Sequence, residues 1–372
     1  KVKQIDLVIR NPSGLHARPA KIFSNVAKRF NSHIRLTYGD KEANAKSVIS
    51  VLTLGVHNGK TVHLEIVGED EEEAVAALET AIADGLGEES GIPQRPERVQ
   101  TEEQALPLTV KNDQRIVLRG ITAAPGMAIG KIFQLHRSEI AVSESFTDPD
   151  NEQTRFSAAT RDASKELRAL REQVANLDED AADIFGVHLE MLEDPDLIGA
   201  TKSSIESGQS ASQAWKASFE EMAVRISEIE DAVIAARSAD VQDVGNRILR
   251  KLAGIESDDV LREREGPLVV VSDDLTPSDT IALDRSKVVG FCTSAGGPTS
   301  HAAILARSLG IPAIVNSGKQ ALELVNGTQV IIDGTAGVLT IDPDHDSVAA
   351  ARASARRQEE THAAAVRAAI QP

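Results

Sequence analysis

The fold is decided by residues 290–316, which read Gly290-Phe-Cys-Thr-Ser-Ala-Gly-Gly-Pro-Thr-Ser-His301-Ala-Ala-Ile-Leu-Ala-Arg-Ser-Leu-Gly-Ile-Pro-Ala-Ile-Val-Asn316. The apolar run 288–292 is typical of a short strand. The Gly296-Gly297-Pro298 sequence after it predicts a turn. Thr299 or Ser300 can then cap a helix, so the stretch predicts a strand, a glycine turn and a helix in succession.

His301 falls in the first turn of this helix, which Gly310 and Pro312 end. The free backbone N–H groups and the helix dipole favour an anion at such a position. A histidine there is suited to carry a phosphoryl group. From position alone, a polar capping histidine without any chemistry is an equally good interpretation.

The residues around His301 resemble a known signature. Residues 296–303 and 306–313 are similar to the phosphohistidine signature of the phosphoenolpyruvate-utilising family. That family includes enzyme I of the sugar phosphotransferase system, pyruvate phosphate dikinase and phosphoenolpyruvate synthase. The resemblance implies that His301 is phosphorylated on Nε2, and that Thr280 holds its ring by a hydrogen bond. Pro298 departs from the pattern, because enzyme I proteins usually carry arginine there.

Composition sets outer limits on the function. The 372 residues suggest two or three domains, and the net charge of −17 argues against a nucleic-acid partner. The single cysteine, Cys292, excludes a disulfide framework and indicates a reducing compartment, here the cytoplasm. We expect neither a membrane-spanning helix nor a signal peptide. The start at Lys1 rather than Met suggests a processed chain or an excised piece.

Residues 1–90 are patterned as a small α/β unit. Alternating apolar residues predict strands, and helical periods predict helices. The strands are expected at 4–9, 34–38 and 61–67, and the helices from His16 onward, at 47–54 and at 71–86.

A second histidine in this unit repeats the arrangement of the first. His16 follows a turn that contains Gly14 and stands at a helix start. Arg18 is close enough to pair with a phosphoryl oxygen, and Pro19 suits a first helical turn. Two histidines placed in this way indicate a phosphoryl relay, whereas the other seven lack the arrangement.

The first ninety residues resemble HPr, the phosphocarrier of the same phosphotransferase system. The resemblance rests on residues 11–20, 44–47, 54–55 and 68–70. It implies an open-faced β-sandwich with helices on one side, in which His16 is phosphorylated on Nδ1 with help from Arg18.

Three further positions in this unit match residues of HPr. Ser47 matches a serine that a kinase modifies in some HPr proteins, although an N-cap is the simpler interpretation. Val48 and Leu52 match a docking patch, for which the alternative is plain core packing.

The rest of the chain is similar to the N-terminal half of enzyme I. Residues 116–132 resemble its opening, with two strands around Pro125-Gly126, and the helical stretch 148–264 resembles its HPr-binding insert. By that match Met191 and Arg237 lie near the HPr surface. The Ala-rich end resembles the linker helix before a C-terminal barrel that binds phosphoenolpyruvate and Mg²⁺.

We therefore expect a multidomain chain of the α/β and α+β classes: an HPr-like open-faced β-sandwich, a linker, and a swivelling phosphohistidine α/β domain with an inserted helical bundle. The expected boundaries are 1–88 for the HPr-like domain, 89–114 for the linker, 115–147 with 265–343 for the phosphohistidine domain, 148–264 for the insert and 344–372 for the linker helix.

The resemblance implies part of a multiphosphoryl transfer protein of the fructose type, in which an enzyme IIA module, HPr and enzyme I share one polypeptide. His301 would then pass a phosphoryl group to His16, and His16 would pass it to an enzyme IIA. The enzyme I barrel is the expected second partner. We expect no metal site in these residues, because phosphoenolpyruvate and Mg²⁺ would bind the barrel.

Two other functions remain open: a relay for a phosphoenolpyruvate-dependent dihydroxyacetone kinase, and a regulatory phosphoprotein module. A pyruvate phosphate dikinase would fit the sequence around His301 but would leave the HPr-like unit unexplained.

Overall fold

The computed structural model describes residues 2–88, 116–135, 140–143, 145–255, 266–282, 286–298 and 300–370. The predicted linker at 89–114 lies outside the described residues, as does Thr299. The chain divides into two compact units. The first comprises Lys1–Gln100, Ile140–Gln173 and Ala182–Ser257, and the second comprises Thr101–Glu139, Val174–Ala181 and Asp258–Pro372.

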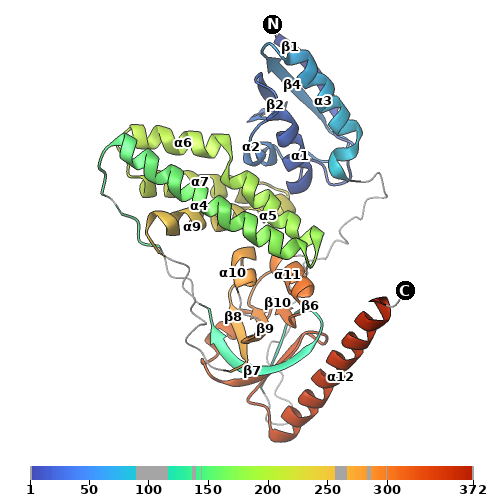
Figure 1. Cartoon of the computed structure of the whole chain (residues 1–372). Coiled ribbons are helices and arrows are strands. Elements are labelled where there is room, and N and C mark those ends of the chain that lie inside the picture. The colour runs from blue at the N-terminus through green and yellow to red at the C-terminus, as the bar shows by residue number, and fades with distance from the viewer. Residues whose placement is uncertain are drawn as a thin grey trace. The chain divides into compact units, whose positions relative to one another are not determined.

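The N-terminal module, residues 2–88, is an antiparallel sheet covered by helices. The strands pair in the order β1-β4-β2-β3. The helix α1 packs on α2 and α3, α2 contacts β3, and α3 lies along β1 and β4 (Figure 1). The elements are β1 (Val2–Val8), α1 (Ala17–Ala27), β2 (His33–Tyr38), β3 (Lys41–Asn44), α2 (Val48–Thr53), β4 (Thr61–Val67) and α3 (Glu71–Ala83).

Alternation explains this sheet. Val62, Leu64 and Ile66 of β4 are all wholly buried, while the residues between them are more exposed, as a sheet with one covered face requires. The open-faced sandwich is confirmed. The strand β3 was not predicted, because Lys41–Asn44 is short, polar and at the sheet edge.

The helical bundle, α4 to α9, belongs to the same unit as the N-terminal module over most of its length. Its helices are α4 (Pro149–Ala175), α5 (Glu179–Leu192), α6 (Pro195–Glu206), α7 (Ala211–Ser227), α8 (Ala232–Ala235) and α9 (Ser238–Leu252). Trp215 of α7 is wholly buried, stacks near Phe156 and Phe219, and donates its indole N–H to the Gly245 carbonyl at 2.8 Å.

The stretch 232–252 has a helical composition throughout, but in the structure it is divided into α8 and α9 at Arg237. The Asp231 carboxylate caps α8 by accepting the Val233 and Ile234 N–H groups. A short capped turn thus precedes α9.

The second unit is built on a mixed sheet in the strand order β5-β12-β11-β7-β8-β9-β10-β6. Strands β7, β8, β9 and β10 run parallel, and the outer strands are antiparallel. The strands are β5 (Ile116–Arg119), β6 (Ile121–Ala124), β7 (Met127–Gln134), β8 (Leu268–Ser272), β9 (Val288–Thr293), β10 (Ala313–Val315), β11 (Gln329–Asp333) and β12 (Val338–Ile341).

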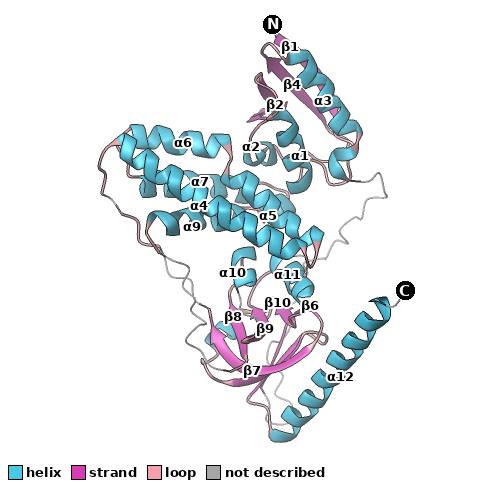
Figure 2. Ribbon diagram, in the orientation of Figure 1, coloured by secondary structure: helices cyan, strands magenta, loops and turns pink. Residues whose placement is uncertain are grey.

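Two helices follow the parallel strands of this sheet. The helix α10 (Pro277–Ala282) comes after β8, and α11 (His301–Leu309) comes after β9. Because the carboxyl ends of parallel strands meet at one edge, both helices start there, and they contact each other (Figure 2).

The Pro125-Gly126 turn leads to an unexpected arrangement. It joins β6 to β7, but these strands do not pair, since β6 pairs with β10 at the sheet edge and β7 pairs with β8 and β11. The final helix, α12 (His345–Ile370), is present where a linker helix was predicted, and it contacts β7.

Among the helices described, none has both the length and the apolar character needed to cross a membrane.

Candidate functional site

His301 is the first residue of α11, within the first helical turn in which the sequence places it. Ser300 precedes it as the N-cap, and its hydroxyl accepts the Ala303 N–H at 3.3 Å. At the other end Gly310 closes the helix in the left-handed conformation with φ 67°. The half-buried His301 therefore stands where the helix dipole favours a negative charge.

Hydrogen bonds hold the loop before α11. The Ala295 N–H donates to the Asp273 carbonyl at 3.0 Å, and the Ser294 hydroxyl donates to the Asp273 carboxylate. From within α11, the Arg307 guanidinium donates to the carbonyls of Ala123 at 2.7 Å and Pro298 at 3.0 Å. These bonds fix the approach to His301 from β8, β6 and the glycine turn.

Thr280 lies on α10, which contacts α11. Its buried hydroxyl donates to the Thr276 carbonyl at 2.9 Å. A hydroxyl group that donates its hydrogen can still accept a hydrogen bond through its oxygen, for example from a ring N–H of histidine. The predicted bond from His301 to Thr280 stays a prediction.

Cys292, on β9, takes no part in the chemistry we expect. It is fully buried, and this burial raises the pKa of its thiol to about 11. The thiol donates to the Ser317 hydroxyl at 3.1 Å. At neutral pH it stays protonated and unreactive.

His16 is the N-cap residue of α1, with extended backbone angles of φ −77° and ψ −175°. Its side chain makes no capping bond to the helix. The ring nitrogens of His16 therefore do not cap α1. The order of glycine turn, histidine and helix agrees with the predicted arrangement.

Gly14 brings a second histidine close to His16. Its φ of 67° is left-handed, and an added Cβ there would lie 2.8 Å from the His57 Cα and closer still to the Val56 carbonyl oxygen. The Leu15 N–H donates to that same carbonyl at 2.8 Å. Because residue 14 has no side chain, the His16 turn can pack on the His57 turn.

Asp231 of the bundle faces both histidines. Its Oδ2 lies 3.6 Å from Nε2 of His16 and 3.4 Å from Nδ1 of His57. Its Oδ1 caps α8. One carboxylate thus joins the helix start to the two imidazoles.

Burial is the main cause that lowers the pKa of His16 below its usual value. The Asp231 charge acts in the opposite direction, and the charges of His57 and Arg237 lower the pKa further. The ring is therefore mainly neutral at neutral pH, which is the state in which a ring nitrogen can act as a nucleophile.

A second group of contacts joins α2 to the turn between α5 and α6. The Ser47 hydroxyl donates to the Asp194 carboxylate at 2.8 Å, while its oxygen accepts the Ser50 N–H and caps α2. The Ile49 N–H donates to Asp194 at 3.2 Å. Burial outweighs these bonds and raises the pKa of Asp194 to about 6.

Basic residues of α1, and Lys28 directly after it, face acidic residues of α5. The Arg18 guanidinium lies 3.3 Å from Asp183, and Lys21 lies 3.5 Å from the same carboxylate. The Lys28 ammonium donates to Glu190 at 2.6 Å. These ion pairs give the N-terminal module a complementary face on the bundle.

The predicted docking residues differ in their surroundings: one lies near His16, and the other three are wholly buried. Arg237 lies near enough to His16 to affect its pKa and pairs with Asp240 at 3.2 Å. Met191 is wholly buried, and it is its neighbours Glu190 and Asp194 that make the contacts to the N-terminal module described above. Val48 and Leu52 are wholly buried on α2, which contacts α7.

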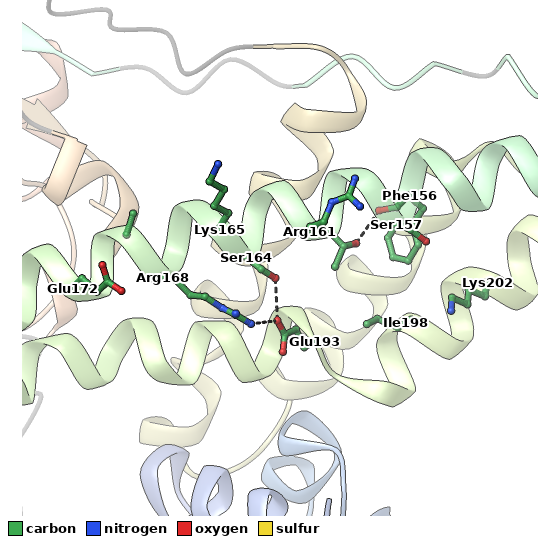
Figure 3. A pocket seen from close by; sticks show the side chains of 12 residues that line it. Phe156, Ser157, Arg161, Ser164, Lys165, Arg168, Glu172, Glu193, Ile198 and Lys202 are labelled. Atoms are coloured by element: carbon green, nitrogen blue, oxygen red, sulfur yellow. Dashed lines mark hydrogen bonds and ion pairs between the residues drawn. The ribbon is translucent and has the colours of Figure 1, made fainter.

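A surface cavity of about 650 Å³ lies elsewhere in the bundle. It is lined by α4 and by residues after α5, and Glu193 accepts hydrogen bonds there from Ser164 at 3.1 Å and Arg168 at 3.0 Å (Figure 3). No histidine lines it, so it is separate from both histidine sites.

Sequence reasoning missed the residues of the bundle that meet the N-terminal module. Asp183, Glu190, Asp194 and Asp231 were not singled out as site residues. The acidic surplus of this helical stretch, set against the basic residues of α1, was a usable signal. No local pattern pointed to His57.

Comparisons with known proteins fit this geometry. The family model for the PTS HPr component phosphorylation site matches residues 3–84. The models for the N-terminal part and the mobile domain of PEP-utilising enzymes match residues 119–237 and 265–337.

Among curated proteins, the multiphosphoryl transfer protein of Rhodobacter capsulatus is 35% identical over 316 residues, which are 84% of this chain and 38% of the relative. That of Xanthomonas campestris pv. campestris is 32% identical over 362 residues, 96% of this chain and 43% of the relative. The chain thus spans about two fifths of the length of these relatives.

A solution structure of enzyme I (nEIt) is 33% identical in sequence and superposes with a TM-score of 0.51; the match covers 65% of this chain and 99% of the enzyme I chain. Fold and matches together define an HPr component joined to the N-terminal and mobile domains of a PEP-utilising enzyme. By the enzyme I match the chain belongs to the enzyme I family of PEP-utilising proteins, and over its own length it is similar to the multiphosphoryl transfer proteins.

Proposed function

We propose that the chain relays a phosphoryl group from phosphoenolpyruvate through His301 to His16, and from there to an enzyme IIA for sugar uptake. The observation that carries the proposal is the repeated arrangement of the two histidines. Each stands at the start of a helix. His16 lies in the segment that matches the PTS HPr component phosphorylation site, and His301 lies in the segment that matches the mobile domain of PEP-utilising enzymes.

The transfer exchanges one P–N bond for another. The lone pair on Nδ1 of His16 attacks the phosphorus, the bond from phosphorus to Nε2 of His301 breaks, and that nitrogen keeps the electron pair. The step is nearly balanced in energy, so the protein mainly supplies position and stabilises the anion. The N-terminus of α1 and Arg18 are the groups that would receive the phosphoryl charge.

Asp231 and Arg18 have complementary parts in this step. A proton on Nε2 of His16 faces the Asp231 carboxylate, which keeps Nδ1 as the nucleophilic nitrogen. Arg18 lies beside Asp183 while His16 is unphosphorylated, and a phosphoryl group on His16 would compete for its guanidinium.

The proposed relay also requires a binding site for phosphoenolpyruvate and Mg²⁺. Mg²⁺ prefers an octahedral set of oxygen ligands. Within either unit, the described residues gather no all-oxygen group of three carboxylates. We therefore place both groups on the phosphoenolpyruvate-binding part of the relatives and derive no step through the metal here.

The test is a labelling experiment. The chain is incubated with labelled phosphoenolpyruvate, Mg²⁺ and a separately supplied phosphoenolpyruvate-binding domain of enzyme I. Label is expected on His301 and then on His16. The His301→Ala chain should take no label at either position, and the His16→Ala chain should hold label on His301 alone. Label at His16 in the His301→Ala chain would refute the relay.

We propose that modification of Ser47 loosens the contact of α2 with Asp194, which makes Ser47 a regulatory position.

The sugar specificity is a separate part of the proposal. Fructose remains the expected sugar. Incubation of the phosphorylated chain with enzyme IIA proteins of different sugar specificity tests that choice, since the cognate one should accept label fastest.

A further inference from the structure

A cluster of three side chains surrounds the phosphocarrier histidine: His16 itself, His57 and Asp231. The relay proposed above assigns no role to His57. Two imidazoles and one carboxylate place one ligand atom each within 4.8 Å of one another. Two of these residues come from the N-terminal module and the third comes from the bundle. We propose that they form a binding site for a zinc-class divalent cation, which ties the phosphocarrier histidine to the bundle.

The distances suit a tetrahedral ion. Ligand atoms about 2.0–2.2 Å from a tetrahedral zinc are about 3.3–3.6 Å from one another. The Asp231 Oδ2 lies 3.6 Å from Nε2 of His16 and 3.4 Å from Nδ1 of His57. Both distances exceed a hydrogen bond and equal the edge of such a tetrahedron. Nitrogen and oxygen ligands in this mixture favour zinc over Mg²⁺ or Ca²⁺.

The three ligands are held by their surroundings. The other oxygen of Asp231 is fixed by the Val233 and Ile234 N–H groups, so that Oδ2 is turned toward the histidines. The His57 turn is fixed by Asn58, whose amide donates to the Arg10 and Asn11 carbonyls at 2.8 Å. Outer contacts of this kind are what orient metal ligands in proteins.

Nε2 of His16 is the atom that would bind the ion. It is shielded from solvent and has no hydrogen-bond partner among the described residues. A metal ion binds the unprotonated nitrogen of an imidazole, so binding at Nε2 would displace a proton from that atom. The His57 side chain is 54% exposed, which leaves a way in for the ion and a place for water as fourth ligand.

A bound ion would hold His16 in place. Metal on Nε2 withdraws electron density from the ring, and the link to Asp231 keeps the N-terminal module on the bundle. We expect zinc to slow phosphoryl transfer to His16, and this consequence, unlike the binding itself, rests on the proposed relay.

Binding is tested on the whole chain, freed of metal. ZnCl₂ is titrated by calorimetry, and CoCl₂ is titrated by visible absorption, because tetrahedral cobalt absorbs strongly and octahedral cobalt weakly. One strong site with the tetrahedral band is expected. His57→Gln, Asp231→Asn and His16→Gln should each weaken it at least about tenfold.

The matched control is His63→Gln. His63 also pairs with a carboxylate, Asp6, at 2.8 Å, but the described part of the chain offers this exposed pair no third ligand. That variant should bind zinc as the unaltered chain does. Zinc affinity that is unchanged in either His57→Gln or Asp231→Asn would overturn the site. Circular dichroism of each variant checks that it is folded.

The transfer assay separates the site from the relay. The rate of label reaching His16 is compared with and without zinc, and the ratio should fall in the unaltered chain but stay near one in His57→Gln. Equal zinc sensitivity in both chains would overturn the inhibitory role. A zinc site in a chain that never labels His16 would refute the relay and leave the site standing.

Discussion

Asp231 connects three features of this molecule through one side chain: the cap of α8, His16 and His57. Such a residue is sensitive to changes of charge but tolerant of changes that keep its shape. Asparagine caps helices about as well as aspartate. Replacement by asparagine therefore removes the charge and leaves the cap.

We predict that Asp231→Asn lowers the pKa of His16 further, because the Asp231 charge acts to raise it. NMR titration of the His16 ring measures this pKa. Asp6→Asn is the control, since Asp6 pairs with His63 and not with His16. An unchanged His16 midpoint in Asp231→Asn would show that the two side chains do not interact in solution.

Gly14 combines a left-handed backbone with a close contact, and Gly39 separates the two effects. Gly39 has φ 60°, but an added Cβ there meets nothing within 4 Å. Alanine in the left-handed region costs about 1–2 kcal/mol at either position. At Gly14 it also meets the Val56 carbonyl and the His57 backbone.

We predict that Gly14→Ala lowers the free energy of unfolding more than Gly39→Ala does, by a further 1–3 kcal/mol or so, about the usual penalty of overpacking. Urea unfolding followed by circular dichroism measures both. Similar losses in the two variants would mean that the His16 turn relaxes away from the His57 turn without cost.

Contacts between elements place α2 against the α5–α6 turn through Ser47. Its hydroxyl donates to Asp194, and Ser50 beside it donates to Asp196. This cluster of oxygens accepts hydrogen bonds readily but leaves little room for another negative charge.

We predict that Ser47→Asp exposes α2 and α6 to amide hydrogen exchange, because the new carboxylate faces Asp194. Salt should reverse part of this effect by screening the charges. Ser47→Ala removes the cap, at about 1 kcal/mol, without adding charge, so salt should not help it. The same salt response in both variants would exclude repulsion as the cause.

The stability of the whole chain should depend on pH through Asp194. Its pKa is raised from 3.8 to about 6 by burial. The folded state therefore holds a proton that the unfolded chain releases between these values. The stabilising contribution is complete below about pH 4 and is lost as the pH rises through about 6.

We predict that the difference in unfolding free energy between the unaltered chain and Asp194→Asn falls by about 2 kcal/mol from pH 4 to pH 7. The fluorescence of Trp215, the single tryptophan, reports on the bundle. A difference that is constant with pH would show that Asp194 is not buried in the folded protein.

Most of the helices and strands, and the placing of the two histidines at helix starts, follow from the sequence alone. Apolar alternation predicts β4 at its observed ends, and the glycine turn with a capping residue after it places His301 in the first turn of α11. Both features are local, since period, cap and turn act over a few residues. The resemblance to HPr and to enzyme I likewise rests on short sequence motifs.

Tertiary structure alone decided what surrounds His16. Asp231 and His57 reach it from positions far along the chain, and Asp194 reaches Ser47 in the same way. No period or motif encodes such pairs, because they depend on how one folded surface meets another. The break between α8 and α9 was hidden for a related reason, because the chain around Arg237 has helical composition, and the cap at Asp231 becomes apparent only from its hydrogen bonds.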